Sequence, residues 1–162
     1  MPGSLEKGKQ MKQPQAVLAR KAMFDQALRM PPAEGKHYLE PFLTFCKETG
    51  FPANVLEDHR VENIPEYHCH EEDLWLCLAG QITFICDGVG VDAYHKEGDA
   101  REWKAKRIEG GNTMVLSPGD WLWIPAGVWH HHSIPDGTAR LVIVKRMAPV
   151  QVPPPDFHIE ST

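Results

Sequence analysis

Two histidines separated by one residue, His68 and His70, have the type and spacing of metal ligands. In an extended strand, side chains two positions apart point to the same face, so both imidazoles would lie side by side. Imidazole is the usual nitrogen ligand for zinc, iron, nickel, manganese and copper. The pair could therefore supply half of a metal site, although such a pair taken alone is more often a hydrogen-bonded surface feature.

Three acidic residues, Glu71-Glu72-Asp73, follow the histidine pair directly. A carboxylate beside two imidazoles completes three ligands of mixed nitrogen and oxygen type, and it offsets part of the charge of a divalent ion. Neighbouring residues in a strand face opposite ways, so only one of Glu72 and Asp73 can face a metal. The residue types alone leave open which of the two it is. An all-histidine site without an acid also stays open, with His132 as the additional ligand.

A further histidine, His130, ends the segment Pro118-Gly119-Asp120-Trp121-Leu122-Trp123-Ile124-Pro125-Ala126-Gly127-Val128-Trp129-His130. The Pro-Gly pair predicts a tight turn that opens a strand, and the later proline and glycine predict a bend just before His130. His132 would share a face with His130, whereas His131 would face the opposite way. Taken alone, His130 could also be a core histidine bonded to the backbone.

Together the two segments resemble the two motifs of the cupin superfamily. His68-x-His70-x-x-Asp73, followed by six residues and Gly80, is similar to the first motif. Residues 118–130 match the second motif, P-G-x5-P-x-G-x-x-H, at every fixed position. The first motif departs from the family pattern because only two residues separate His70 from Asp73, and the family usually has Glu there. Counting back from Gly80, as in the family, makes Asp73 the first candidate, and the longer reach of a glutamate makes Glu72 the second.

The resemblance implies one divalent metal held by His68, His70, Asp73 and His130. Fe(II) is the favoured ion, with Mn, Ni, Zn or Cu as alternatives. It further implies a metal-dependent enzyme acting on a small organic molecule, first of all a dioxygenase. An isomerase or lyase that uses the metal as a Lewis acid is the alternative, as is a binding cupin without turnover. Tryptophans close to the ligands in sequence could wall a pocket or pack in a core or dimer contact: Trp75, Trp121, Trp123 and Trp129.

The elements that must position these residues are mostly short strands. After Pro52, runs rich in Val, Ile, Leu, Trp and Thr alternate with Gly, Pro, Asp and Asn, which is typical of an antiparallel barrel. Strands are expected near 54–61, 66–70, 73–79, 81–86, 89–94, 102–108, 113–117, 120–124, 128–134 and 139–146. With the resemblance, the fold class is all-β, a cupin-type double-stranded β-helix (jelly-roll barrel) with a short helical N-terminal extension.

The expected organisation along the chain has four parts. Residues 1–14 form a disordered leader, and residues 15–51 a helical N-terminal extension with helices at 15–30 and about 38–49. Residues 52–147 form the cupin barrel. Residues 148–162 form an extended tail, because Pro153-Pro154-Pro155 cannot join a central strand.

Composition narrows the possible partners and location. The chain has 17 basic and 22 acidic side chains and a net charge of −5, which argues against nucleic acid or an anionic membrane as partner. The four cysteines form no C-x-x-C pair, the N-terminus lacks an apolar signal core, and no apolar run is long enough to span a bilayer. A cytoplasmic protein with reduced thiols is expected. A small-molecule substrate is the expected partner. The chain is also expected to form a homodimer, because the barrel has edge strands to cover.

Overall fold

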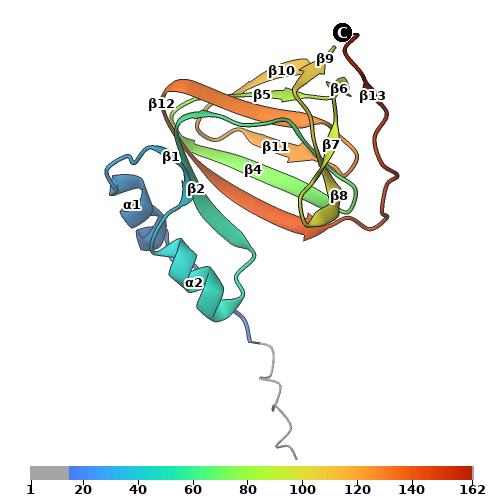
Figure 1. Cartoon of the computed structure of the whole chain (residues 1–162). Coiled ribbons are helices and arrows are strands. Elements are labelled where there is room, and N and C mark those ends of the chain that lie inside the picture. Colours follow the sequence, from blue (N-terminus) through green and yellow to red (C-terminus); the bar gives the residue numbers. More distant parts are fainter. Residues whose placement is uncertain (1–14, 162) are drawn as a thin grey trace, which may run out of the picture.

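Ten of the described strands form one antiparallel sheet that curves around a core (Figure 1). The computed structural model describes residues 15–161, so the expected leader at 1–14 lies outside the described residues. The sheet contains β1 (Gly35–Tyr38), β2 (Ala53–Glu62), β3 (Glu66–His68), β4 (Glu71–Ala79), β5 (Ile82–Cys86), β7 (Tyr94–Lys96), β8 (Asp99–Lys104), β10 (Asn112–Leu116), β11 (Trp121–Ile124) and β12 (His130–Met147). A small second sheet contains β6 (Val89–Val91), β9 (Arg107–Glu109) and β13 (Phe157–His158).

The long strand β12 holds the two layers of the barrel together. Its first part pairs with β5, its second part pairs with β4, and both parts pair with β2. The sequence predicts two strands here, at 128–134 and 139–146, but they form one strand of 18 residues. Pro135-Asp136-Gly137 interrupts the pairing with β2 as a β-bulge between Ile134 and Thr138, so the chain bends without turning back.

The barrel core contains the inward-facing residues of alternate strand positions. In β4, Asp73, Trp75 and Cys77 are buried, while Leu74 and Leu76 between them are only partly buried. The main cluster of buried apolar side chains includes Leu56, Trp75, Cys77, Ile82, Phe84, Leu116, Ile124, Leu141 and Ile143. One buried face and one more open face explain the alternating pattern seen in the sequence.

The N-terminal part packs against the barrel and contains a strand as well as helices. The helices are shorter than expected: α1 is Lys21–Arg29, and α2 is Phe42–Thr49, ending at Gly50 with a positive φ of 74°. Between them, residues 35–38 form β1 where the sequence pattern predicts no strand. This strand depends on its neighbour, because all four of its residues pair with residues 56–59 of β2. Neither described helix has the length and hydrophobicity that crossing a membrane requires.

A buried ion pair fixes the N-terminal part to the barrel. Arg140 donates to Glu57 at 2.7 Å, and both side chains are buried. The same guanidinium also donates to the carbonyls of Leu28 and Met30 at the end of α1. The extension therefore has a defined position on β2, which matters because β1 reaches the opening of the barrel.

Candidate metal centre

Two neighbouring strands bring two histidines and a glutamate together. β3 contributes Glu66 and His68, two positions apart on one strand face, and β12 pairs His130 directly opposite Glu66. Nε2 of His68 lies 3.8 Å from Oε2 of Glu66, and Nε2 of His130 lies 3.9 Å from the same oxygen. Ligand atoms of all three residues lie within 4.8 Å of one another, close enough to share one ion.

Asp73 of β4 faces the same histidine pair from another strand. Its Oδ2 lies 3.7 Å from Nε2 of His130 and 4.0 Å from Nε2 of His68. Asp73 is buried, and it forms a second possible ligand group with His68 and Glu71. Two imidazole nitrogens thus face one oxygen from each of two carboxylates. Ligand atoms that share an ion at roughly 2.0–2.2 Å are themselves separated by about 3–4 Å.

The hydrogen bond of His130 shows which of its ring nitrogens carries the proton and which faces the carboxylates with a lone pair. Its Nδ1 lies 2.9 Å from the carbonyl oxygen of Val128, which can only accept, so Nδ1 carries the proton in the neutral ring. Nε2 then presents a lone pair toward two carboxylate oxygens. The buried Nε2 atoms of His68 and His130 have no hydrogen-bond partner among the described residues. Facing lone pairs repel, and a cation between them would satisfy all four atoms.

The protonation states favour metal binding near neutral pH. Burial lowers the pKa of His130 to about 4, and burial also lowers the pKa of His68, so both rings stay neutral. Burial on its own would raise the pKa of Glu66. The hydrogen bond and charge of Lys104 outweigh that effect and lower the pKa to about 2. Neutral imidazole and ionised carboxylate are the forms that bind a metal.

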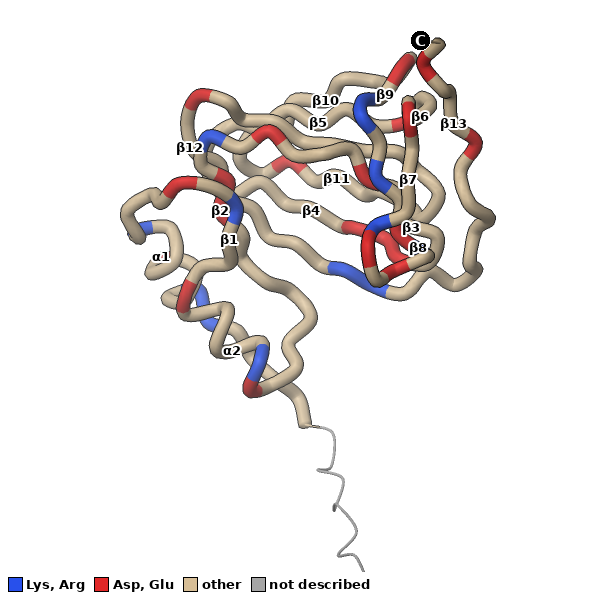
Figure 2. Tube along the Cα trace, viewed as in Figure 1, with Lys and Arg blue, Asp and Glu red and all other residues tan. Residues whose placement is uncertain are grey.

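A lysine backs each of the two carboxylates. Lys104 contacts Oε1 of Glu66, and Nζ of Lys145 lies 2.8 Å from Oδ1 of Asp73, so in each case the other oxygen faces the histidines. Lys145 also lies 2.8 Å from Oε1 of Glu71. Figure 2 shows acidic and basic residues gathered at the end of the barrel where β3, β4, β8 and the end of β12 meet. The two lysines hold the carboxylates in position, and Lys104 keeps Glu66 ionised.

Of the four ligands expected from the sequence, His68, Asp73 and His130 come together, while His70 belongs to neither ligand group. β3 ends at His68, and Cys69 and His70 form a bend before β4. The rule that residues two apart share a face therefore does not apply to His70. Its carbonyl instead accepts a hydrogen bond from the backbone of Ala148 at 2.8 Å.

Glu66 is a candidate ligand that the sequence motifs do not predict. The signal was present, because Glu66 stands two positions before His68 just as His70 stands two positions after it. Whether Glu66 or His70 shares a strand face with His68 depends on where the strand begins and ends. The residue types alone do not fix those ends.

The other candidate residues lie elsewhere. Glu72 is on the outer side of β4, 2.6 Å from Nε of Arg146. His132 is deep in the barrel, with Nε2 3.0 Å from Oδ2 of Asp58, although not in hydrogen-bonding geometry. Trp121 and Trp123 are 61% and 55% exposed, so neither packs in the core.

A cavity of about 250 Å³ adjoins the candidate ligands. It is lined by Lys36, Glu66, His68, Glu71, Asp73, Trp75, Lys96, Glu102 and Lys145. A larger hollow of about 430 Å³ lies over β4 and β12, beside Glu72, Asp73, Trp123 and Arg146, but no histidine lines it. The smaller cavity is therefore the one in which a bound molecule would meet a metal.

No family model and no curated protein sequence matches the chain. Solved structures with similar folds include the Drosophila melanogaster CENP-C cupin domain, with 16% identity over 62% of this chain and 59% of that one and a TM-score of 0.41. Hydroquinone 1,2-dioxygenase from Sphingomonas sp. TTNP3, with 4-hydroxybenzoate bound, has 20% identity over 80% and 75% and a TM-score of 0.43. dTDP-4-dehydrorhamnose 3,5-epimerase from Elizabethkingia anophelis NUHP1 has 15% identity over 68% and 65% and a TM-score of 0.40.

For five of the similar structures, the chain covers only 49–65% of their length. Likenesses this distant indicate no substrate or reaction. The chain's own architecture identifies the fold, because the antiparallel barrel brings His68 and Asp73 of the first motif to His130 of the second. The expected fold class is confirmed: the chain has a cupin-type, all-β fold with a short helical extension.

Proposed function

We propose that the protein is a metal-dependent enzyme that acts on a small organic molecule in the cavity beside Glu66, His68, Asp73 and His130. In this proposal the four residues hold one divalent ion. An oxygenase that uses Fe(II) is the reaction class we propose first, because sites that mix imidazole and carboxylate ligands and keep open positions suit Fe(II).

One observation carries the proposal. The buried Nε2 atoms of His68 and His130 lack a hydrogen-bond partner among the described residues and face carboxylate oxygens at 3.7–4.0 Å. Buried polar atoms are normally satisfied, and an unsatisfied group costs about 1–3 kcal/mol. A shared cation removes that cost for both histidines at once, so the four residues fit a metal better than they fit one another.

The chain's own residues define the rest of the site. Lys104 and Lys145 each hold one oxygen of a ligand carboxylate, which leaves the other oxygen free for the ion. Trp75 forms an apolar wall that excludes water from one side of the cavity. A bound Fe(II) would supply oxygen chemistry, and Zn or Ni would supply Lewis-acid polarisation of the substrate.

Proton-transfer chemistry, as in an isomerase or lyase, is a second candidate because of Glu71. This carboxylate lines the cavity and contacts Lys145, and it lies on the same strand face as Asp73. A carboxylate beside the ligands but not needed among the four could take up or release a substrate proton.

The test begins with metal analysis of protein purified without added metal. We expect about one equivalent of a divalent metal per chain in the wild type and little in His130→Ala. The purified protein would then be assayed for oxygen uptake with a panel of small organic substrates. Iron with substrate-dependent oxygen uptake supports the oxygenase, and zinc or nickel without uptake favours the Lewis-acid reaction. Full metal content in His130→Ala would contradict the metal site itself.

A further inference from the structure

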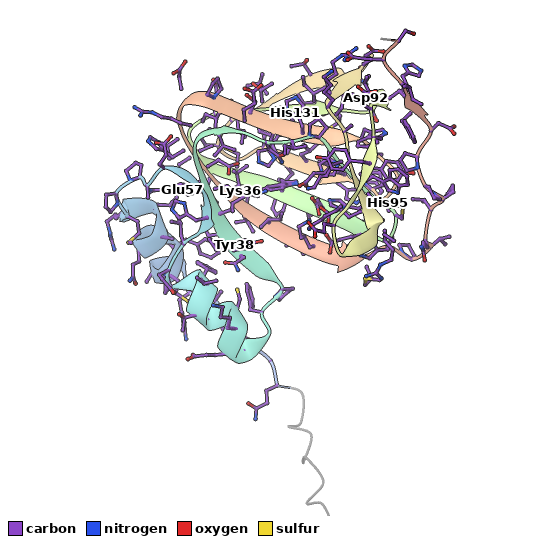
Figure 3. All side chains as sticks on the ribbon, viewed as in Figure 1. Lys36, Tyr38, Glu57, Asp92, His95 and His131 are labelled. Carbon is purple, nitrogen blue, oxygen red and sulfur yellow. The ribbon has the colours of Figure 1, made fainter. Side chains whose placement is uncertain are left out.

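Lys36 reaches the cavity from outside the barrel strands that carry the candidate ligands. It lies on β1, at the edge of the sheet beside β2 (Figure 3), directly opposite the buried Asp58. Residues opposite each other in a pair of strands share a face, so Lys36 points to the inner side of the sheet. Its Nζ lies 5.9 Å from the ring centroid of Trp75, and both residues line the cavity.

Lys36 differs from the other lysines at the site because it has no ion-pair partner in residues 15–161. Lys96 pairs with Glu102 at 2.9 Å, and Lys145 pairs with Asp73 and Glu71. A contact with the face of a tryptophan stabilises a cation by only about 0.5–1 kcal/mol at an exposed position. Lys36 therefore has a charge available for another group in the cavity.

The charges around the cavity balance only without a metal. Three lysines and four carboxylates line it, and Lys104 behind Glu66 brings the lysines to four. A divalent ion held by these carboxylates would leave an excess of two positive charges in a partly enclosed space. Such an excess attracts anions from solution and favours their binding.

We propose that the substrate is a small organic anion whose carboxylate or similar acidic group contacts Lys36 while the rest of the molecule lies toward Trp75 and the metal. This inference rests on the proposed function and gives its substrate class. The cavity of about 250 Å³ has the volume of roughly eight waters, which suits a molecule of about ten non-hydrogen atoms. Lys36 then determines specificity, and β1 is the element of the N-terminal extension that delivers it.

The test compares charged and neutral molecules of the same shape. Zinc-loaded protein would be titrated by calorimetry with benzoate and acetate, and with benzamide and acetamide as neutral counterparts. The variants are Lys36→Met, which removes the charge, and Lys36→Arg, which keeps it. Lys47→Met on the exposed side of α2 is the matched control, because it removes an equal charge far from the cavity. Zinc content would be measured for every sample.

We expect the wild type to bind at least one of the two anions about ten-fold more tightly than its amide, the usual effect of one charge-assisted contact. Lys36→Met should reduce that preference at least about five-fold with zinc content unchanged, while Lys36→Arg and Lys47→Met keep it. Zinc bound with no preference for anions, or a preference that Lys36→Met does not change, would overturn this inference and leave the proposed function standing. A wild type that binds no zinc would overturn both.

Discussion

Nζ of Lys145 lies 2.8 Å from Oδ1 of Asp73, while Oδ2 of the same carboxylate lies 3.7 Å from Nε2 of His130. One buried carboxylate thus contacts a fixed cation with one oxygen and faces the candidate metal position with the other. In the metal-free protein, the lysines provide the main compensation for the charge of the ligand carboxylates. A metal would add a second cation on the inner side.

Lys145→Met should destabilise the metal-free protein more than the metal-loaded protein. Asp73 is only 2% exposed, so without Lys145 its charge would lack a close cationic partner. Lys145 is partly exposed, which limits the expected loss in the free energy of unfolding to about 1–2 kcal/mol. Denaturant unfolding with a chelator and with added zinc would measure both losses. Lys47→Met is the control, and equal losses in the two states would contradict the prediction.

How far the sequence predicts the site is seen best in His70 and Glu66. The spacing of the two motifs predicts a barrel with His68, Asp73 and His130 near one another, and the structure brings these three together. Whether Glu66 or His70 joins them depends on where β3 ends. That end depends on backbone contacts of the bend at Cys69 and His70. These contacts come from Arg101, Ala148 and Val152, residues distant in the sequence. No local pattern around residue 68 contains that information.

Glu66→Gln and His70→Ala form a matched test of the ligand set. Glu66→Gln keeps the shape of the side chain but removes a charged oxygen that lies 3.8–3.9 Å from both histidines. We expect it to weaken metal binding at least about ten-fold, in the range known for groups that tune a metal site. His70→Ala should change the affinity little. Competition with a coloured chelator gives both values, and the reverse order would support the set His68, His70, Asp73 and His130.

Asp73→Asn and Glu72→Gln test which of two adjacent acids binds the metal. Asp73 faces the histidines, whereas Glu72 contacts Arg146 on the outer side of β4. Asp73→Asn should weaken zinc affinity at least about ten-fold, and Glu72→Gln should leave it nearly unchanged. Both variants remove one negative charge, so each serves as the electrostatic control for the other. If Glu72→Gln has the larger effect, β4 binds the metal in a register shifted by one residue.

The sequence predicts less of the N-terminal extension than of the barrel. Its helices follow from apolar spacing, proline and glycine, but β1 does not, because Gly35-Lys36-His37-Tyr38 lacks the alternation of a strand with a buried face. β1 forms through pairing with β2, and the Arg140–Glu57 pair holds the preceding segment in place. Long-range contacts of this kind are invisible to local periodicity, and they bring Lys36 to the cavity.

The metal-free protein should lose stability as the pH falls from about 6.5 to about 4. Burial lowers the pKa of His130 in the folded state to about 4, below the ordinary value of 6.5 that applies to the unfolded chain. Between these values the unfolded chain takes up a proton that the folded chain resists, so acid favours unfolding. The contribution of His130 to the free energy of unfolding is present in full above about pH 6.5 and falls by about 3 kcal/mol toward pH 4. Burial lowers the pKa of His68 as well, which acts in the same direction.

Glu66 should contribute to the stability in a different pH range, so its contribution can be separated from that of His130. Lys104 outweighs the effect of burial and lowers the pKa of Glu66 to about 2, so its contribution is present above the ordinary value of 4.5 and is lost only below it. Unfolding in denaturant with a chelator, at pH 5.0, 5.75, 6.5 and 7.5, therefore leaves out most of the Glu66 contribution and reports mainly on the histidines. His130→Gln, which cannot titrate, should remove much of the slope between pH 5.0 and 6.5, while the surface variant Lys47→Met keeps it. An unchanged slope in His130→Gln would show that His130 does not carry the pH dependence.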